Sequence, residues 1–127
     1  MVIWHRARKK KSTGGLYRQF ADKKKRELGR TPAHTKISVE NKIRTIRMRG
    51  ANFKQKALGL KIVNLFDSIT KKFSKADIKK VIDNKSSRHF ARMGVMTKGA
   101  VIETTAGKAK ITNRPGQEGY INAVLIK

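Results

Sequence analysis

Apolar and polar positions alternate over short stretches of the chain from residue 37 onward. A period of two residues is typical of strands that bury one face. In residues 42–49, this alternation places Arg44, Ile46 and Met48 on the same face. The pattern predicts strands over residues 42–49, 53–58, 60–66, 100–105, 108–112 and 120–126. Many short strands punctuated by glycine favour a mainly β protein, a small β-barrel of mostly antiparallel strands, over a sandwich.

Three short segments near the C-terminus have the composition of turns or loops. Ala106-Gly107 separates the strands predicted over 100–105 and 108–112, which makes this pair a candidate hairpin. Residues 113–116 read Asn-Arg-Pro-Gly, a turn by composition. Residues 116–119 formally match the GXXG loop of KH domains. The glutamate inside this loop and the strands around it favour an ordinary glycine-permitted loop.

Residues 74–83 fit two structures about equally well. Ser74-Lys75-Ala76-Asp77 has the form of a capping box, and Ile78, Val81 and Ile82 follow at helical spacing. These local signals predict a short helix. A buried, irregular strand is the alternative, and the residues themselves leave the choice open.

The charge balance indicates an anionic partner. The 127 residues include 32 Lys or Arg and 8 Asp or Glu, a formal net charge of +24. Such an excess destabilises an isolated compact chain through self-repulsion. Residues 1–36 alone hold 12 basic and 2 acidic side chains. We therefore predict a basic N-terminal extension over residues 1–36, a single barrel domain over residues 37–127, and a nucleic acid as the partner.

The extension contains two basic runs, at residues 8–11 and 23–26. Between them lies Ser12-Thr13-Gly14-Gly15, whose paired glycines suit a sharp bend. Residues 16–28 have the spacing of a short basic helix that ends before Gly29. Because its like charges repel, we expect this segment to be disordered until an anionic partner orders it.

The sequence lacks the usual marks of a catalytic or metal centre. It has no cysteine, its eight acidic residues are scattered, and its three histidines lack metal-ligand spacing. It contains neither a Walker loop nor a G-x-S-x-G nucleophile elbow. We therefore expect no enzymatic activity, no cofactor, no metal ion and no small-molecule substrate. Without a long apolar run or a secretory signal, we also expect a cytosolic chain that does not contact membranes.

Three segments resemble the S8e family of ribosomal proteins of the archaeal and eukaryotic small subunit. The first joins Trp4, residues 12–15 and residues 23–32, the second is 44–58, and the third is 98–126. The resemblance implies a small β-barrel with a basic extension, acting as a structural component of the cytoplasmic ribosome and bound to ribosomal RNA of the small subunit. Neighbouring ribosomal proteins are further candidate partners, and no specific homo-oligomer is expected.

The resemblance also implies which residues face RNA. In the extension they are Trp4, His5, Arg6, Arg8, Lys9, Lys10, Lys11, Ser12, Thr13, Gly14, Gly15, Tyr17, Arg18, Lys23, Lys24, Lys25, Arg26 and Arg30. In the domain they are Arg44, Arg47, Arg49, Asn52, Lys54 and Lys56. The aromatic rings of the extension either stack on unpaired bases or anchor the extension to its own domain.

The resemblance also bears on Asn52 and on residues 76–83, and two alternative functions stay open. Asn52 matches the family's Gly-x-Asn turn after Gly50, where it either contacts RNA or stabilises the turn. The resemblance also favours a strand over residues 76–83. Two other functions would use the same electrostatics, an architectural DNA-binding protein and an RNA-binding module that regulates translation.

Overall fold

A computed structural model describes residues 3–5, 9–18, 21–22 and 24–126 of the chain. The chain divides into two compact units, Met1–Pro32 and Ala33–Lys127.

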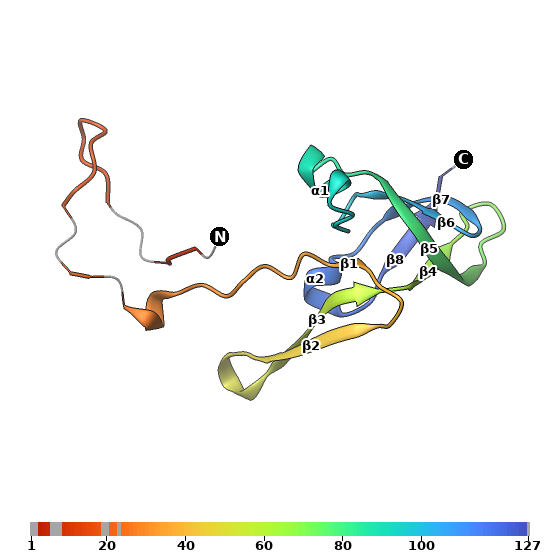
Figure 1. Cartoon of the computed structure of the whole chain (residues 1–127), viewed down its shortest axis with the longest axis horizontal. Coiled ribbons are helices and arrows are strands. Elements are labelled where there is room, and N and C mark those ends of the chain that lie inside the picture. The colour runs from red at the N-terminus through yellow and green to blue at the C-terminus, as the bar shows by residue number, and fades with distance from the viewer. Residues whose placement is uncertain (1–2, 6–8, 19–20, 23, 127) are drawn as a thin grey trace. The chain divides into compact units, whose positions relative to one another are not determined.

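The second unit is built around a closed five-stranded barrel (Figure 1). Its strands are β4 (Ile62–Phe66), β5 (Phe73–Asp83), β6 (Val101–Thr104), β7 (Gly107–Ile111) and β8 (Asn122–Leu125). Successive strands pair antiparallel, and β8 closes the barrel by pairing parallel to β4. The predicted small barrel of mostly antiparallel strands is confirmed, including the β6–β7 hairpin.

Alternate positions of the barrel strands fill its interior. Leu65 of β4, Ile102 of β6 and Ile111 of β7 are almost completely buried. Small side chains such as Ala109 and Ala123 belong to the same core cluster. Since a five-stranded barrel encloses little space, this mixture of large and small residues fills it without a central channel.

A smaller sheet of three strands lies beside the barrel in the same unit. Its order is β1 (Lys36–Ile37), β3 (Phe53–Leu60) and β2 (Lys42–Arg47). β2 and β3 form an antiparallel hairpin, which extends away from the barrel strands in Figure 1. Only Lys61 separates β3 from β4, so the hairpin is a direct continuation of the barrel.

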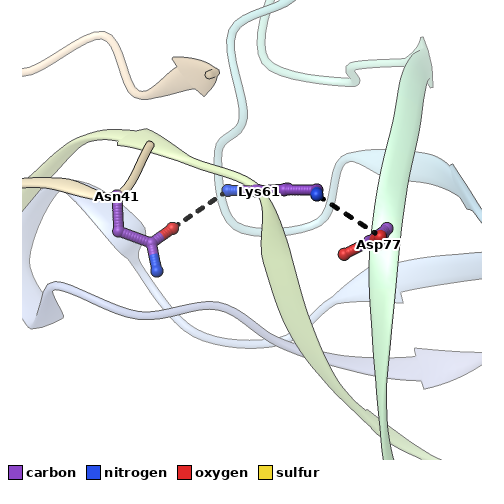
Figure 2. A network of polar contacts seen from close by, with 3 residues as sticks. All are labelled: Asn41, Lys61 and Asp77. Atoms are coloured by element: carbon purple, nitrogen blue, oxygen red, sulfur yellow. Dashed lines mark hydrogen bonds and ion pairs between the residues drawn. The ribbon is translucent and has the colours of Figure 1, made fainter. Parts of the chain in front are cut away.

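Lys61 connects the two sheets at this junction (Figure 2). Its backbone amide donates to Asn41 Oδ1 at 3.2 Å, just before β2 begins. Its ammonium group lies 3.8 Å from Asp77 Oδ2 on β5. Both side chains of this ion pair are half exposed, so we assign the pair a small stabilising contribution. The contacts nevertheless define where the hairpin meets the barrel.

Short helical segments occupy the connections. They are α1 (Arg88–Arg92), α2 (Pro115–Glu118) and the 3-10 turns η1 (Lys25–Glu27) and η2 (Arg49–Ala51). The turn predicted at residues 113–116 is realised as the entry into α2, which starts at the proline and ends at left-handed Gly119. No helix in the described part of the chain is long and apolar enough to cross a membrane.

The strand that the resemblance favours over residues 76–83 is confirmed, because this segment belongs to strand β5, and the helix indicated by the local signals is not formed. Ala76 and Ile78 are buried in the barrel, and Val81 packs against the same core. The register of β5 against β6 shifts between Ile78 and Lys80 and again after Val81. Such bulges let residues three apart both face inward, which explains the helix-like spacing.

The basic helix predicted over residues 16–28 is also not found in the described part of that range. Leu16 instead forms an isolated bridge with Lys10, and only Lys25–Glu27 adopt a 3-10 turn. That turn has no side-chain hydrogen bond at its N-cap, Lys24. Repulsion between neighbouring lysines opposes a longer helix here.

Candidate nucleic-acid interface

The register of the β2–β3 hairpin decides which basic residues share a face. Arg44 lies directly opposite Lys56, and Ile46 lies opposite Lys54. Because directly opposed residues of an antiparallel pair point to the same side, Arg44, Lys54 and Lys56 share one face. We call these three residues the basic face of the hairpin. Arg44 and Lys54 are exposed, and Lys56 is half-buried.

The opposite side of the hairpin is packed at its base. Ala57 is completely buried, and its cross-strand partner is Ile43. Gly119, which follows α2, lies so close that a Cβ atom there would be 3.1 Å from Cβ of Gln55 and 3.6 Å from Cγ2 of Ile43. The side chains on this side therefore pack the hairpin against the rest of the domain. The residues that alternate with them along the strands form the basic face.

The tip of the hairpin is a tight turn at Gly50 and Ala51. Both residues have positive φ, 67° and 60°, which is the signature of a type I′ turn. Asn52 closes this turn, since its side-chain amide donates to the carbonyl of Arg49 at 3.3 Å. The turn-stabilising role considered for Asn52 is thus present. The geometry places Arg49 within the turn itself.

A second surface lies on the other side of the hairpin near this tip. Arg47 is directly opposite Phe53, whose side chain is 67% exposed. An exposed ring beside a guanidinium group is a combination that can stack on an unpaired base. The sequence pattern placed Phe53 in a strand and gave no sign that its ring is exposed, so Phe53 was not predicted to stack on RNA bases.

In the first unit, the predicted bend between the two basic runs is confirmed. Lys11 N donates to the carbonyl of Gly15 at 2.7 Å, and Tyr17 N donates to the carbonyl of Lys9 at 3.1 Å. Gly14 has a φ of 84°, which an L side chain adopts only with strain. The Lys11 ammonium group lies 5.6 Å from the ring centroid of Tyr17, within range of a cation–π contact.

A short ladder joins the two ends of this unit. Trp4 forms an antiparallel bridge with Leu28, His5 N donates to the carbonyl of Glu27, and Gly29 N donates to the carbonyl of Ile3. Gly29 is buried at this crossing. A Cβ atom at this position would lie 2.5 Å from the Ile3 carbonyl oxygen, so only glycine fits.

The chain is similar to known proteins over nearly its whole length. A family model described as ribosomal protein S8e matches residues 4–126. The chain belongs to the ribosomal protein S8e family. It is 48% identical to small ribosomal subunit protein eS8 of Methanococcus vannielii over 126 residues, which is 99% of this chain and 98% of that protein. It is also 48% identical to the eS8 protein of Nanoarchaeum equitans over 115 residues, 91% of this chain and 90% of that protein.

The predicted RNA-binding residues of this S8e chain fall into two groups, one in each unit. Arg6, Arg8 and Lys23 lie outside the described residues. Trp4 is half-buried. The other predicted residues of the extension are exposed, namely His5, Lys9, Lys10, Lys11, Ser12, Thr13, Gly14, Gly15, Tyr17, Arg18, Lys24, Lys25, Arg26 and Arg30.

Two further cations of the S8e domain, Lys98 and Arg114, were not among the predicted residues. Both are exposed, and both line a cavity that also includes Lys56. Each stands alone in a sequence region where positive charge is sparse, so charge density gave no signal for them. In the described part of the chain, no group of three or more histidine and acidic side chains is arranged to hold a metal ion.

Proposed function

We propose that this S8e protein is a structural component of the small ribosomal subunit, where it binds ribosomal RNA through its basic extension and the basic face of its hairpin. The identity of its relatives supports the cellular setting, since those proteins are named small ribosomal subunit proteins.

The observation that carries the proposal is the pairing of Arg44 with Lys56 across the hairpin. Like charges directly opposite each other destabilise a sheet. Lys54 adds a third cation to the same face, and residues 41–66 contain no Asp or Glu. A phosphate group placed against this face would replace repulsion with charge-assisted hydrogen bonds.

The extension supports the same partner by a different route. Its described lysines and arginines are exposed. Its backbone is held by the hydrogen bonds of a bend at residues 11–15 and of a ladder between residues 3–5 and 27–29. Backbone hydrogen bonds of this kind stabilise a small unit only weakly against the repulsion of its charges. We propose that RNA orders the extension. Contacts with RNA phosphates neutralise its positive charges, and this gain offsets the conformational entropy lost on ordering.

The sequence-based division into an extension over 1–36 and a domain over 37–127 remains part of this proposal. In functional terms, the domain presents the basic face of the hairpin, and the extension supplies a second set of RNA contacts. Phosphate contacts of both kinds position a protein without reading base sequence. Arg47 beside exposed Phe53 provides the one place on the hairpin where stacking on an unpaired base would add to them.

Binding to transcribed small-subunit ribosomal RNA at several salt concentrations tests the proposal. If about ten phosphates are contacted, log K falls with log salt at a slope of roughly −7 to −9. A chain with Arg44, Lys54 and Lys56 replaced by Gln should show a slope shallower by about 2 to 3. An unchanged slope in this variant would exclude the basic face of the hairpin as an RNA-binding surface.

The cellular role is tested by sedimenting a native lysate after a wash at roughly 0.5 M salt, which weakens loose electrostatic binding. One copy of the chain retained per small subunit supports the proposal. Recovery at the top of the gradient, together with a preference for duplex DNA, would support an architectural DNA-binding protein. Retention well below one copy per subunit would support a regulatory module instead.

A further inference from the structure

The second unit contains a cavity of about 500 Å³ whose rim carries positive charge from separate parts of the chain. Lys56 comes from β3, Lys98 from the loop before β6, and Arg114 from the residue before α2. None of the described residues that line the cavity is acidic. We call this cavity the basic pocket. Its lining residues all belong to the second unit, and it reaches beyond the hairpin.

The floor of the basic pocket is rigid. Thr35, Val95 and Met96 line it and are at most 2% exposed. Thr35 Oγ1 donates to the carbonyl of Ala57 at 2.6 Å. Met96 N donates to the carbonyl of Thr35 at 2.8 Å. The pocket is therefore formed before a ligand arrives, which lowers the cost of binding.

One wall is held by a network of polar side chains around Asn84, which is 3% exposed. Its amide donates to the carbonyl of Val95, and its Oδ1 accepts from the hydroxyl of Thr97 at 2.9 Å. The Ser86 hydroxyl lies 3.3 Å from that of Thr97. These bonds fix residues 95–97, and thereby the backbone from which Lys98 projects.

We propose that the basic pocket binds a phosphate group of RNA, held among Lys56, Lys98 and Arg114. Arg and Lys are the side chains that bind phosphate most strongly, and a concave site concentrates their field. A volume of about 500 Å³ exceeds a bare phosphate and suits a nucleotide, whose less polar part would meet the floor at Met96 and Pro115. This inference rests on the proposed function, because it takes RNA as the source of the phosphate.

RNA is favoured over an acidic polypeptide by the position of Lys56. This residue belongs both to the basic pocket and to the basic face of the hairpin, where it pairs with Arg44. A single RNA strand that crosses the hairpin can therefore continue into the pocket. An RNA strand carries one phosphate per nucleotide, so it can occupy the basic face and the basic pocket at the same time.

The decisive variant replaces Lys98 and Arg114 by Gln in the full-length chain. Arg114 is the N-cap residue of α2, but its side chain makes no capping hydrogen bond, so the fold should be retained. The matched control replaces Lys79 of β5 and Lys110 of β7 by Gln. These two lysines are also exposed and lie outside the basic pocket, so both variants lose the same charge.

Affinity for transcribed small-subunit ribosomal RNA is measured for wild type, pocket variant and control over a series of KCl concentrations. We expect the pocket variant to lose about tenfold in affinity and about 1 in salt slope, as for one lost phosphate contact. The control should keep the wild-type slope. Equal slopes in all three proteins would overturn the inference while leaving the proposed function intact. Failure of the wild type itself to bind RNA would overturn the proposed function.

A second measurement identifies the source of the phosphate. Amide NMR spectra of the full-length chain are recorded with inorganic phosphate, with adenosine monophosphate and with a short polyglutamate peptide. Shifts at Thr97, Lys98 and Gln117 with the first two ligands, lost in the pocket variant, support a phosphate site. The same shifts with polyglutamate alone would overturn it in favour of an acidic polypeptide. Pocket shifts with the mononucleotide but an unchanged RNA affinity in the variant would assign a free nucleotide as the ligand instead of RNA.

Discussion

Repulsion between Arg44 and Lys56 should lower the stability of the protein when RNA is absent. These residues lie directly opposite each other on β2 and β3. Replacing Arg44 by Gln should therefore stabilise the free protein at low salt, although the same change weakens RNA binding. The neighbouring pair Ile43–Ala57 includes a completely buried alanine. The base of the hairpin consequently unfolds with the core, and the effect appears in global unfolding.

The expected magnitude follows from the register. Opposed side chains of an antiparallel pair begin about 5 Å apart at Cβ. Two charges about 6 Å apart in water repel by about 0.7 kcal/mol. Measured cross-strand interactions of this kind span about 0.2 to 1 kcal/mol. We expect Arg44→Gln to stabilise the free protein by about 0.5 kcal/mol at 20 mM salt. At 1 M salt the Debye length is about 3 Å, so the gain should vanish.

A double-mutant cycle measures this repulsion directly. Urea unfolding followed by circular dichroism is compared for wild type, Arg44→Gln, Lys56→Gln and the double variant, at both salt concentrations. Once the first charge is removed, removing the second should give little further gain. Lys110→Gln is the control, since Lys110 lies opposite Val101 and Val124 and has no like charge across the strand. Additive effects at low salt, or a coupling that persists in 1 M salt, would refute the reasoning.

Three further predictions concern the rest of the chain. Thr35→Val should destabilise the domain by about 1 to 3 kcal/mol in urea unfolding, because the carbonyl of Ala57 loses a buried hydrogen bond, whereas Thr35→Ser should change it much less. In the RNA-bound protein, Gly29→Ala should break the ladder with Ile3, since the added Cβ would lie 2.5 Å from its carbonyl oxygen; NMR of the complex should show this loss with the barrel resonances unchanged. Deletion of residues 1–30 should leave the circular dichroism of a folded barrel and weaken RNA binding by at least tenfold; an unfolded remainder or an unchanged affinity would contradict it.

The strand β5 shows a limit of predicting secondary structure from local sequence patterns. Its residues Ser74 to Asp77 match a capping box, and Ile78 and Val81 are three apart, as on one side of a helix. In the barrel, two register shifts against β6 turn both apolar side chains toward the core. A bulge depends on the partner strand, and no residue within the segment encodes that partner.

The extension illustrates a different limit. The glycines at 14 and 15 predicted a bend, and the bend is present because Gly14 adopts a φ of 84° that other residues resist. The helix predicted over 16–28 rested on spacing alone. The described part of this range forms an isolated bridge at Leu16 and a 3-10 turn at Lys25–Glu27. Spacing is a weak signal where charges of one sign dominate.

Local patterns in the chain were enough to predict the class of the protein: a mainly β chain of short strands, a net charge of +24, and segments that identify the S8e family. These properties depend on composition and on neighbours within a few residues. The closure of the barrel by β8 against β4, and the meeting of Lys56, Lys98 and Arg114 around one cavity, became visible in the folded domain alone. Residues so distant in the chain meet only because burying alternate apolar positions forces the strands into one closed sheet, and no local pattern records that closure.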